Sequence, residues 1–268
     1  MRIRPQRLRV RHRRLAGVFV LLAALLTVGT AYSVATTRTG SAASGDPGAQ
    51  IAQGRALFLQ GCASCHGKAG EGTAAAPSLI GVGAAAVDFQ VSTGRMPLAQ
   101  AGAQAPAKRP RYTQEQIDAL AAYVASLGPG PAIPGKEQYT PPKNADLAFG
   151  GTLFRTNCSA CHNFTGEGGA LAYGKKAPPL THATDKQLYE AMLTGPGTMP
   201  VFSDQQLTPQ EKQDIIAYIT TVRSVPDPGG FNLGRLGPVT EGLVGWLIGM
   251  GVLAVVAMWI GARAKRAQ

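Results

Sequence analysis

Two stretches of the chain are apolar over the length of a membrane-crossing helix, and one lies near each end. Residues 15–35 (LAGVFVLLAALLTVGTAYSVA) and residues 242–260 (GLVGWLIGMGVLAVVAMWI) contain no charged side chain. Helices of this length reach about 30 Å, the thickness of the hydrocarbon layer of a bilayer. The pattern predicts a transmembrane helix over 242–260. Over 15–35 it predicts either a second transmembrane helix or a signal peptide, cleaved near the small residues Ala31, Ser33 and Ala35.

Between these stretches, a unit of about 80 residues occurs twice. GRALFLQGCASCHGKAGEG begins at Gly54, and GGTLFRTNCSACHNFTGEG begins at Gly150. Three further blocks follow in the same order: APSL and APPL, GRMP and GTMP, and two amphipathic segments that begin at Thr113 and Thr208. Four matching blocks indicate a duplicated small domain. We therefore predict domains over 46–128 and 144–225.

The hydrophobic spacing within each copy is helical. In the segment after Thr113, apolar residues recur at intervals of three and four, which is typical of a helix with one buried face. Thr208 is followed by Pro209 and Glu211, which predicts a helix start with a capping box, and Asp46 before Pro47 predicts another start. No alternating strand pattern stands out, so the predicted fold class is all-α. Proline-rich linkers, expected to be extended, occupy 129–143 and 226–241.

The chain carries a net charge of +11, but most of the excess flanks the apolar stretches. Residues 1–14 hold seven arginines and the tail 261–268 is basic, whereas residues 36–240 hold 16 basic and 14 acidic side chains. A nucleic-acid-binding protein would spread this charge over a folded surface, so that class is excluded. The positive-inside rule predicts that both termini face the cytoplasm and both repeated domains lie outside the cell membrane.

All four cysteines belong to two C-x-x-C-H motifs, Cys62-Ala-Ser-Cys65-His66 and Cys158-Ser-Ala-Cys161-His162. Zinc binding, thiol–disulfide exchange and covalent haem attachment all use paired cysteines. A zinc site would need both pairs together, yet each pair lies inside its own complete repeat. A redox-active pair normally follows a strand in a thioredoxin-like unit, and neither pair does. The adjacent histidine favours two covalently bound haem c groups, each with the histidine as an axial iron ligand.

Each haem iron needs a sixth ligand, for which Met96 and Met199 are the candidates. Both occupy the same repeat position in a G-x-M-P context, and a thioether is a soft ligand for haem iron. Met192 and His182 are alternatives in the second copy, but neither has a counterpart in the first. The other ring nitrogen of a ligand histidine usually donates to a carbonyl group, and we expect Pro77 and Pro178, or their neighbours, to provide it.

Each copy resembles a class I cytochrome c, with C-x-x-C-H near the start, P-x-L, M-P and a closing helix. The whole arrangement resembles the dihaem cytochrome c subunit of the actinobacterial quinol–cytochrome c reductase, the cytochrome bc complex. The resemblance implies an all-α protein of two tandem class I cytochrome c domains with N-terminal and C-terminal transmembrane helices. It implies partners in cytochrome b, a Rieske iron–sulfur protein as electron donor, and a terminal haem–copper oxidase as acceptor.

Other functions fit parts of the pattern. A dihaem cytochrome c subunit of a terminal oxidase or of a periplasmic dehydrogenase would have similar domains, and fold analogy does not separate them from the reductase subunit. A dihaem peroxidase would be an enzyme in its own right, but it needs an open iron position. A zinc-stabilised membrane scaffold would contain no haem. The sequence predicts no catalytic residue on the chain itself, which would act as a carrier within a translocase.

Overall fold

The computed structural model describes residues 16–31, 46–100, 102–225 and 238–266 of the 268-residue chain. The predicted basic N-terminal segment, the cleavage site beyond Ala31 and most of the second linker lie outside the described residues. The chain divides into two units, Met1–Ala52 and Gln53–Gln268, and the second contains both C-x-x-C-H motifs.

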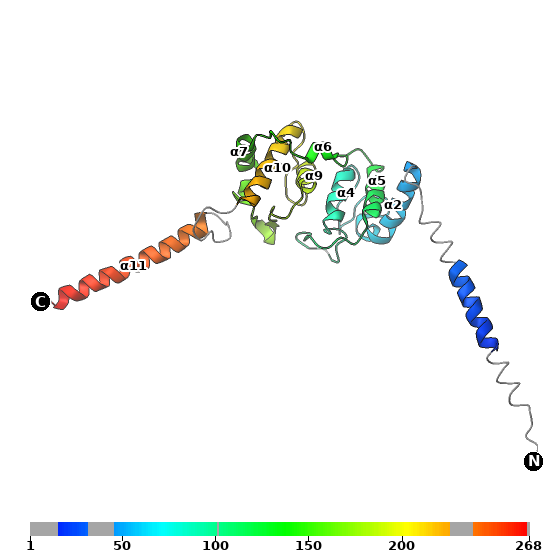
Figure 1. The fold of residues 1–268 in the computed structure, drawn as a ribbon, viewed down its shortest axis with the longest axis horizontal. Coiled ribbons are helices and arrows are strands. Elements are labelled where there is room, and N and C mark those ends of the chain that lie inside the picture. Colours follow the sequence, from blue (N-terminus) through cyan, green and yellow to red (C-terminus); the bar gives the residue numbers. More distant parts are fainter. Residues whose placement is uncertain (1–15, 32–45, 101, 226–237, 267–268) are drawn as a thin grey trace, which may run out of the picture. The chain divides into compact units, whose positions relative to one another are not determined.

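The structure is helical, as predicted, with a single small strand pair among the described residues. The helices of the first copy are α2 (Pro47–Gly61), α3 (Ala63–His66), α4 (Gly83–Ser92) and α5 (Gln114–Ala125). The rest of the chain contains α6 (Lys136–Tyr139), α7 (Leu147–Asn157), α8 (Ser159–His162), β1 (Gly169–Ala170), the 3₁₀ turn η1 (Ala172–Gly174), β2 (Lys176–Ala177), α9 (Asp185–Thr194), α10 (Pro209–Ser224) and α11 (Pro238–Arg266). Figure 1 shows α7, α9 and α10 grouped together, with α6 between them and α4 and α5.

The helices begin where the sequence predicts. Thr208 accepts a hydrogen bond from the backbone N–H of Glu211, and the Glu211 carboxylate accepts one from the backbone N–H of Thr208, so α10 starts with a capping box. Thr113 does the same for α5 with Gln116. Asp46 accepts from the N–H of Gly48 at the start of α2. These side chains satisfy N–H groups that a helix start otherwise leaves unpaired.

In both copies, the first and last helices cross at a glycine. A Cβ atom on Gly54 would overlap the carbonyl oxygen of Ala119 in α5, and one on Gly150 would overlap that of Asp214 in α10. One turn further on, Phe154 packs against Tyr218 with ring centroids 5.5 Å apart. The corresponding pair in the first copy, Phe58 and Tyr123, is 5.2 Å apart. The duplication therefore extends from sequence to helix packing.

The predicted extended linker over 129–143 is folded onto its neighbours. The carbonyl of Pro131 accepts a hydrogen bond from the N–H of Ala85 in α4. Further along the linker, α6 is held to α10 because Gln213 donates to the carbonyl groups of Glu137 and Gln138. The expectation of an extended spacer is wrong here, because carbonyl groups along the linker accept hydrogen bonds from both copies.

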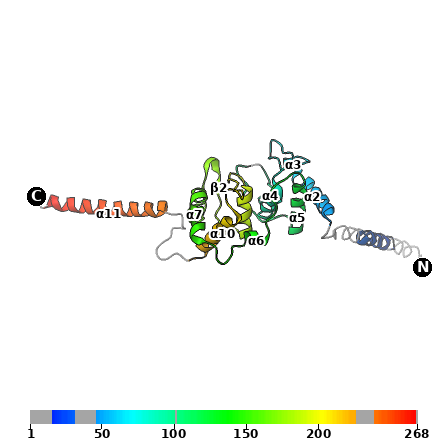
Figure 2. The same ribbon diagram turned by 90° about the horizontal axis from the view of Figure 1, so that it is seen from above.

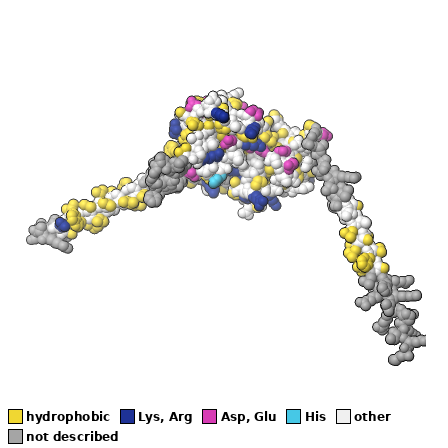
Figure 3. Space-filling view, in the orientation of Figure 1, with side chains coloured by type: hydrophobic (Ala, Val, Ile, Leu, Met, Phe, Trp, Pro, Cys, Tyr) yellow, Lys and Arg dark blue, Asp and Glu magenta, His cyan; other side chains and the backbone are white. Residues whose placement is uncertain are grey.

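Near the C-terminus, α11 contains a 22-residue stretch, Gly242–Arg263, that is long and apolar enough to cross a membrane. Its described side chains are exposed, and Figure 3 shows it covered by hydrophobic atoms. The apolar helix near the N-terminus, Ala16–Ala31, is shorter. Exposure of this much apolar surface is expected of a helix whose surroundings are lipid.

Candidate functional site

Each C-x-x-C-H motif forms a single helical turn directly after the first long helix of its copy. The carbonyl of Cys62 accepts hydrogen bonds from the N–H groups of Cys65 and His66, at 3.1 and 3.0 Å. The second motif repeats this arrangement, with the carbonyl of Cys158 as the acceptor. One turn of helix places both cysteines and the histidine on the same short element, so the thiols and the imidazole are offered to one ligand.

Both histidine rings are fixed by a backbone carbonyl, as predicted. Nδ1 of His66 lies 2.8 Å from the carbonyl oxygen of Pro77, and Nδ1 of His162 lies 3.0 Å from that of Pro178. Since a carbonyl only accepts, Nδ1 carries the proton and Nε2 keeps a free lone pair. Burial lowers the pKa of His162, against the opposite effect of the Pro178 hydrogen bond, so its imidazole is neutral. A neutral ring held in this way is suited to ligate a metal.

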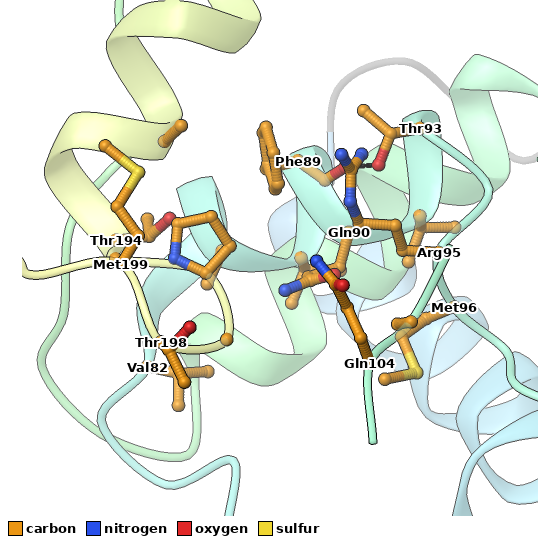
Figure 4. A pocket seen from close by; sticks show the side chains of 18 of the residues that line it. Val82, Phe89, Gln90, Thr93, Arg95, Met96, Gln104, Thr194, Thr198 and Met199 are labelled. Carbon is orange, nitrogen blue, oxygen red and sulfur yellow. Dashed lines mark hydrogen bonds between the residues drawn. The ribbon is translucent and has the colours of Figure 1, made fainter. Parts of the chain in front are cut away.

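The two histidines and the two predicted methionines line one cavity of about 1050 Å³. His66 and Met96 come from the first copy, and His162 and Met199 come from the second. Figure 4 shows Met96 and Met199 on opposite sides of this space, each on the loop that follows α4 or α9. Pockets for one small ligand range from about 300 to 1,000 Å³, so this volume lies at the upper end of that range and suits a large ligand.

The chemistry of the cavity fits haem. Its wall is largely apolar and includes Phe58, Leu120 and Ile215, as a porphyrin face requires. Burial, and then the charge of the neighbouring motif cysteine, raise the pKa of Cys62 to about 11 and that of Cys158 to about 12. Catalytic thiol–disulfide exchange normally uses a thiol with a lowered pKa, so that alternative does not match these environments.

The two alternative ligands of the second copy lie in different surroundings. Met192 is 4% exposed and belongs to the apolar core formed with residues such as Phe154 and Ile216, although it also reaches the cavity wall. His182 is exposed and is not among the residues that line the cavity.

Several features of the site were missed by reasoning from the sequence. The second copy has five more residues between its motif histidine and the following proline, and this longer segment contains a hairpin in which β1 pairs with β2. Gln104 of the first copy holds this hairpin through two hydrogen bonds with the backbone of Lys176, at 2.7 and 3.0 Å. Arg95, next to Met96, lines the cavity and lies over the ring of Phe89. The hairpin had one available signal in the sequence: the offset between the two copies increases after the C-x-x-C-H motifs.

Comparisons with known proteins now identify the two copies. Residues 51–128 match the cytochrome c family, and residues 145–219 match the family described as cytochrome C oxidase, cbb3-type, subunit III. The chain is 47% identical to the cytochrome bc1 complex cytochrome c subunit of Corynebacterium efficiens, over 95% of this chain and 93% of that one. It is 46% identical to the subunit of the same name from Mycobacterium bovis, over 96% and 94% of the two chains.

This chain belongs to the cytochrome bc1 complex cytochrome c subunit family. The predicted resemblance is thereby confirmed, and so is the fold of two cytochrome c domains. A more distant relative, the cbb3-type cytochrome c oxidase subunit CcoP of Azospirillum, is 32% identical over 58% of this chain and 57% of its own. Membership identifies the chain as a respiratory cytochrome c and implies haem c as its cofactor.

Proposed function

We propose that this chain is a membrane-anchored electron carrier with two covalently bound haem c groups. It accepts electrons from a Rieske iron–sulfur protein and delivers them to a terminal haem–copper oxidase, as part of a quinol–cytochrome c reductase that also contains cytochrome b. The observation that carries the proposal is the single cavity lined by His66 and Met96 from one copy and by His162 and Met199 from the other. The family to which the chain belongs supports the same reading.

The cysteines and the histidine of each motif would make different bonds to the cofactor. Haem c, when bound, supplies one-electron chemistry at its iron. Cys62 and Cys65 in the first copy, like their counterparts in the second, would form thioether bonds to it. His66 presents Nε2 in a fixed orientation because Pro77 accepts from the other nitrogen. With Met96 and Met199 as the second axial ligands, the chain fills both positions, which favours a carrier over a peroxidase.

Arg95, which lines the cavity together with Lys175 and Lys176, would pair with a carboxylate of a bound haem. It is half-buried in the cavity wall and lies over the ring of Phe89, 4.9 Å from the centroid. A guanidinium group that is stacked in this manner is oriented before it meets a carboxylate, so less entropy is lost when the pair forms.

The anchor would hold the haem domains outside the cytoplasmic membrane. α11 supplies an apolar span, and basic residues follow it at its end. Basic flanks remain on the cytoplasmic side, so the residues that precede α11 lie on the other side. On the surface shown in Figure 3, acidic and basic side chains are mixed, without a large patch of one sign. Attachment to the membrane then replaces charge steering as the means of meeting a partner.

Purification in mild detergent tests the assignment to a complex. We expect cytochrome b and a Rieske protein to be recovered with the chain, and the alkaline haemochrome spectrum of denatured protein to give two c-type haems per chain. Recovery without those subunits would defeat the reductase assignment but leave the haem sites intact. Carbon monoxide binding by the reduced native protein at neutral pH would instead indicate an open iron position and favour a peroxidase.

A further inference from the structure

The two cytochrome domains meet through equivalent helices, α4 of the first copy and α9 of the second. Two acidic side chains are buried where these helices pack. Asp88 of α4 is 1% exposed and Glu190 of α9 is 0% exposed. Buried carboxyl groups are costly unless they are paired or neutral, so their presence at this contact calls for a physical explanation.

Lys186 compensates one of the two carboxylates. Its Nζ atom lies 2.5 Å from Oδ2 of Asp88, which makes an ion pair between the domains. Gln114 of α5 donates to the other oxygen of Asp88, at 3.2 Å. Asp88 therefore has a partner for each oxygen, and these hydrogen bonds suit an ionised carboxylate.

Glu190 has a different environment. Its nearer oxygen lies 3.7 Å from Nζ of Lys186, beyond hydrogen-bond distance, and among the described residues neither of its oxygens has a hydrogen-bond partner as an acceptor. One lysine does not neutralise two carboxylates. Glu190 is satisfied if it carries a proton, because a carboxylic acid can then donate to Asp88. With Glu190 neutral, Lys186 and Asp88 balance each other and the buried cluster has no net charge.

Electrostatics favour the same assignment. Burial, and then the hydrogen bond with Asp88 and its charge, raise the pKa of Glu190 to about 9, outweighing Lys186. Burial alone would raise the pKa of Asp88, but hydrogen bonds with Glu190 and Lys186 outweigh it and lower that pKa. Burial would lower the pKa of Lys186, but Asp88 and Glu190 outweigh it, and Tyr139 of α6 adds to the increase. Gln114 of α5 also donates a hydrogen bond to Asp88.

We propose that Asp88, Lys186 and Glu190 form an interdomain latch that holds the two cytochrome domains against each other, with Glu190 as the neutral acid that donates to Asp88. The latch residues are positioning residues. They do not line the cavity, but they join the two helices that precede the methionine loops. Their role rests on the proposed function, since the shared cavity would bring two haem groups together only while the domains stay closed.

The latch makes closure depend on pH in a defined direction. Glu190 in an opened, hydrated contact would regain an ordinary carboxyl pKa near 4.5, against about 9 when closed. Between these values the closed form binds one more proton than the open form, so each pH unit increases opening by about tenfold. Closure is therefore strongest at low pH within this window and weakens as pH rises toward 9. The Asp88–Lys186 pair does not titrate there and supplies the part of closure that is independent of pH.

Hydrogen exchange measured on the full haem-loaded chain in detergent tests the latch. We expect the protection of backbone amides in α4 and α9 to fall at least tenfold from pH 7 to pH 9, after correction for the intrinsic rate, whereas α2 and α7 keep theirs. Glu190→Gln replaces the acid by an amide that donates to Asp88 at every pH, so α4 and α9 should stay protected without the pH dependence. Asp88→Asn should reduce their protection at least tenfold already at pH 7.

Two controls keep the result interpretable. Asp118→Asn, like Asp88→Asn, removes one negative charge beside Gln114, which donates a hydrogen bond to Asp118. It should leave the protection of α4 and α9 unchanged. Retained protection in α2 and α7 shows that each domain is still folded. Protection of α4 and α9 that is independent of pH in the wild-type protein, or lost to the same extent in Glu190→Gln and Asp88→Asn, would overturn the latch. Neither outcome depends on the haem count or on the partner subunits. Failure of the latch can therefore be told apart from failure of the proposed function.

Discussion

Nδ1 of His162 lies 3.0 Å from the carbonyl oxygen of Pro178, although 15 residues separate the two along the chain. The same bond forms in the first copy over a loop that is five residues shorter, between His66 and Pro77. The extra residues of the second copy are accommodated in the hairpin of β1 and β2. The orientation of Nε2, the proposed ligand atom, is thus preserved while the surface loop varies, as expected if each ring is to face a metal.

Replacement of the axial methionines tests the ligand assignment. Met199→Ala should remove about half of the near-infrared absorption that ferric haem shows with thioether ligation, because one of two such sites is lost. The reduced variant should bind carbon monoxide at the second haem, and the potential of that haem should fall. Absorption and carbon monoxide titration measure both effects.

The matched control is Met192→Leu, a change that conserves side-chain volume in the core of the same domain. It should cost less than about 1.5 kcal/mol in unfolding free energy and leave the absorption unchanged. If Met192→Leu halved the band while Met199→Ala left it at full strength, the assignment of Met199 would be wrong.

The glycine at the helix crossing is required for close packing in both domains. Gly150→Ala should destabilise the second domain by about 1–3 kcal/mol, because the new Cβ would overlap the carbonyl oxygen of Asp214 in α10. Alanine is otherwise a better helix former than glycine by about 1 kcal/mol. Helix propensity alone would therefore stabilise the variant, and a net loss of stability indicates the steric overlap. Thr152→Ala, at an exposed position of the same helix, is the control for denaturant unfolding. A stabilised Gly150→Ala protein would contradict the observed crossing.

The capping box of α10 makes a smaller contribution. Thr208→Ala removes the acceptor for the N–H of Glu211, 3.3 Å away, and should cost about 1 kcal/mol. Thr208→Ser keeps the hydroxyl and should recover most of that loss. Thermal unfolding of the three proteins measures the difference, and equal melting temperatures for Thr208→Ala and wild type would show that the cap is not needed.

How much of this structure the sequence could predict depends on the range of each interaction. Local signals were sufficient for the helix starts at Asp46 and Thr208, whereas the pairing of each histidine with a methionine, which the duplication predicts, stays a prediction. Contacts between the domains had no such signal, because Asp88 and Glu190 are 102 residues apart in the chain. Asp88 lies in a helix of mostly small and apolar residues, where a single acid resembles a solvent-facing residue until the packing partner is known.

Stability should depend on pH through the same buried acid. The folded-state pKa of Glu190, about 9, lies above its ordinary value of 4.5, so the folded protein binds more protons than the unfolded chain between these two values. Stability must then fall as pH rises through this window and become level above it. The pKa of Asp88 is lowered instead, so its contribution is present above its ordinary pKa of 3.8 and is lost as pH falls through the lower folded value.

The variant Glu190→Gln isolates the first effect, because it cannot titrate while every other group still does. We expect the unfolding free energy of the wild type to fall steadily relative to that of Glu190→Gln from pH 6 to pH 9. Other titrating groups cancel in this difference, which denaturant midpoints measured at each pH supply. A difference that stayed constant over this range would mean that Glu190 titrates alike in the folded and unfolded chain, which its complete burial makes unfavourable.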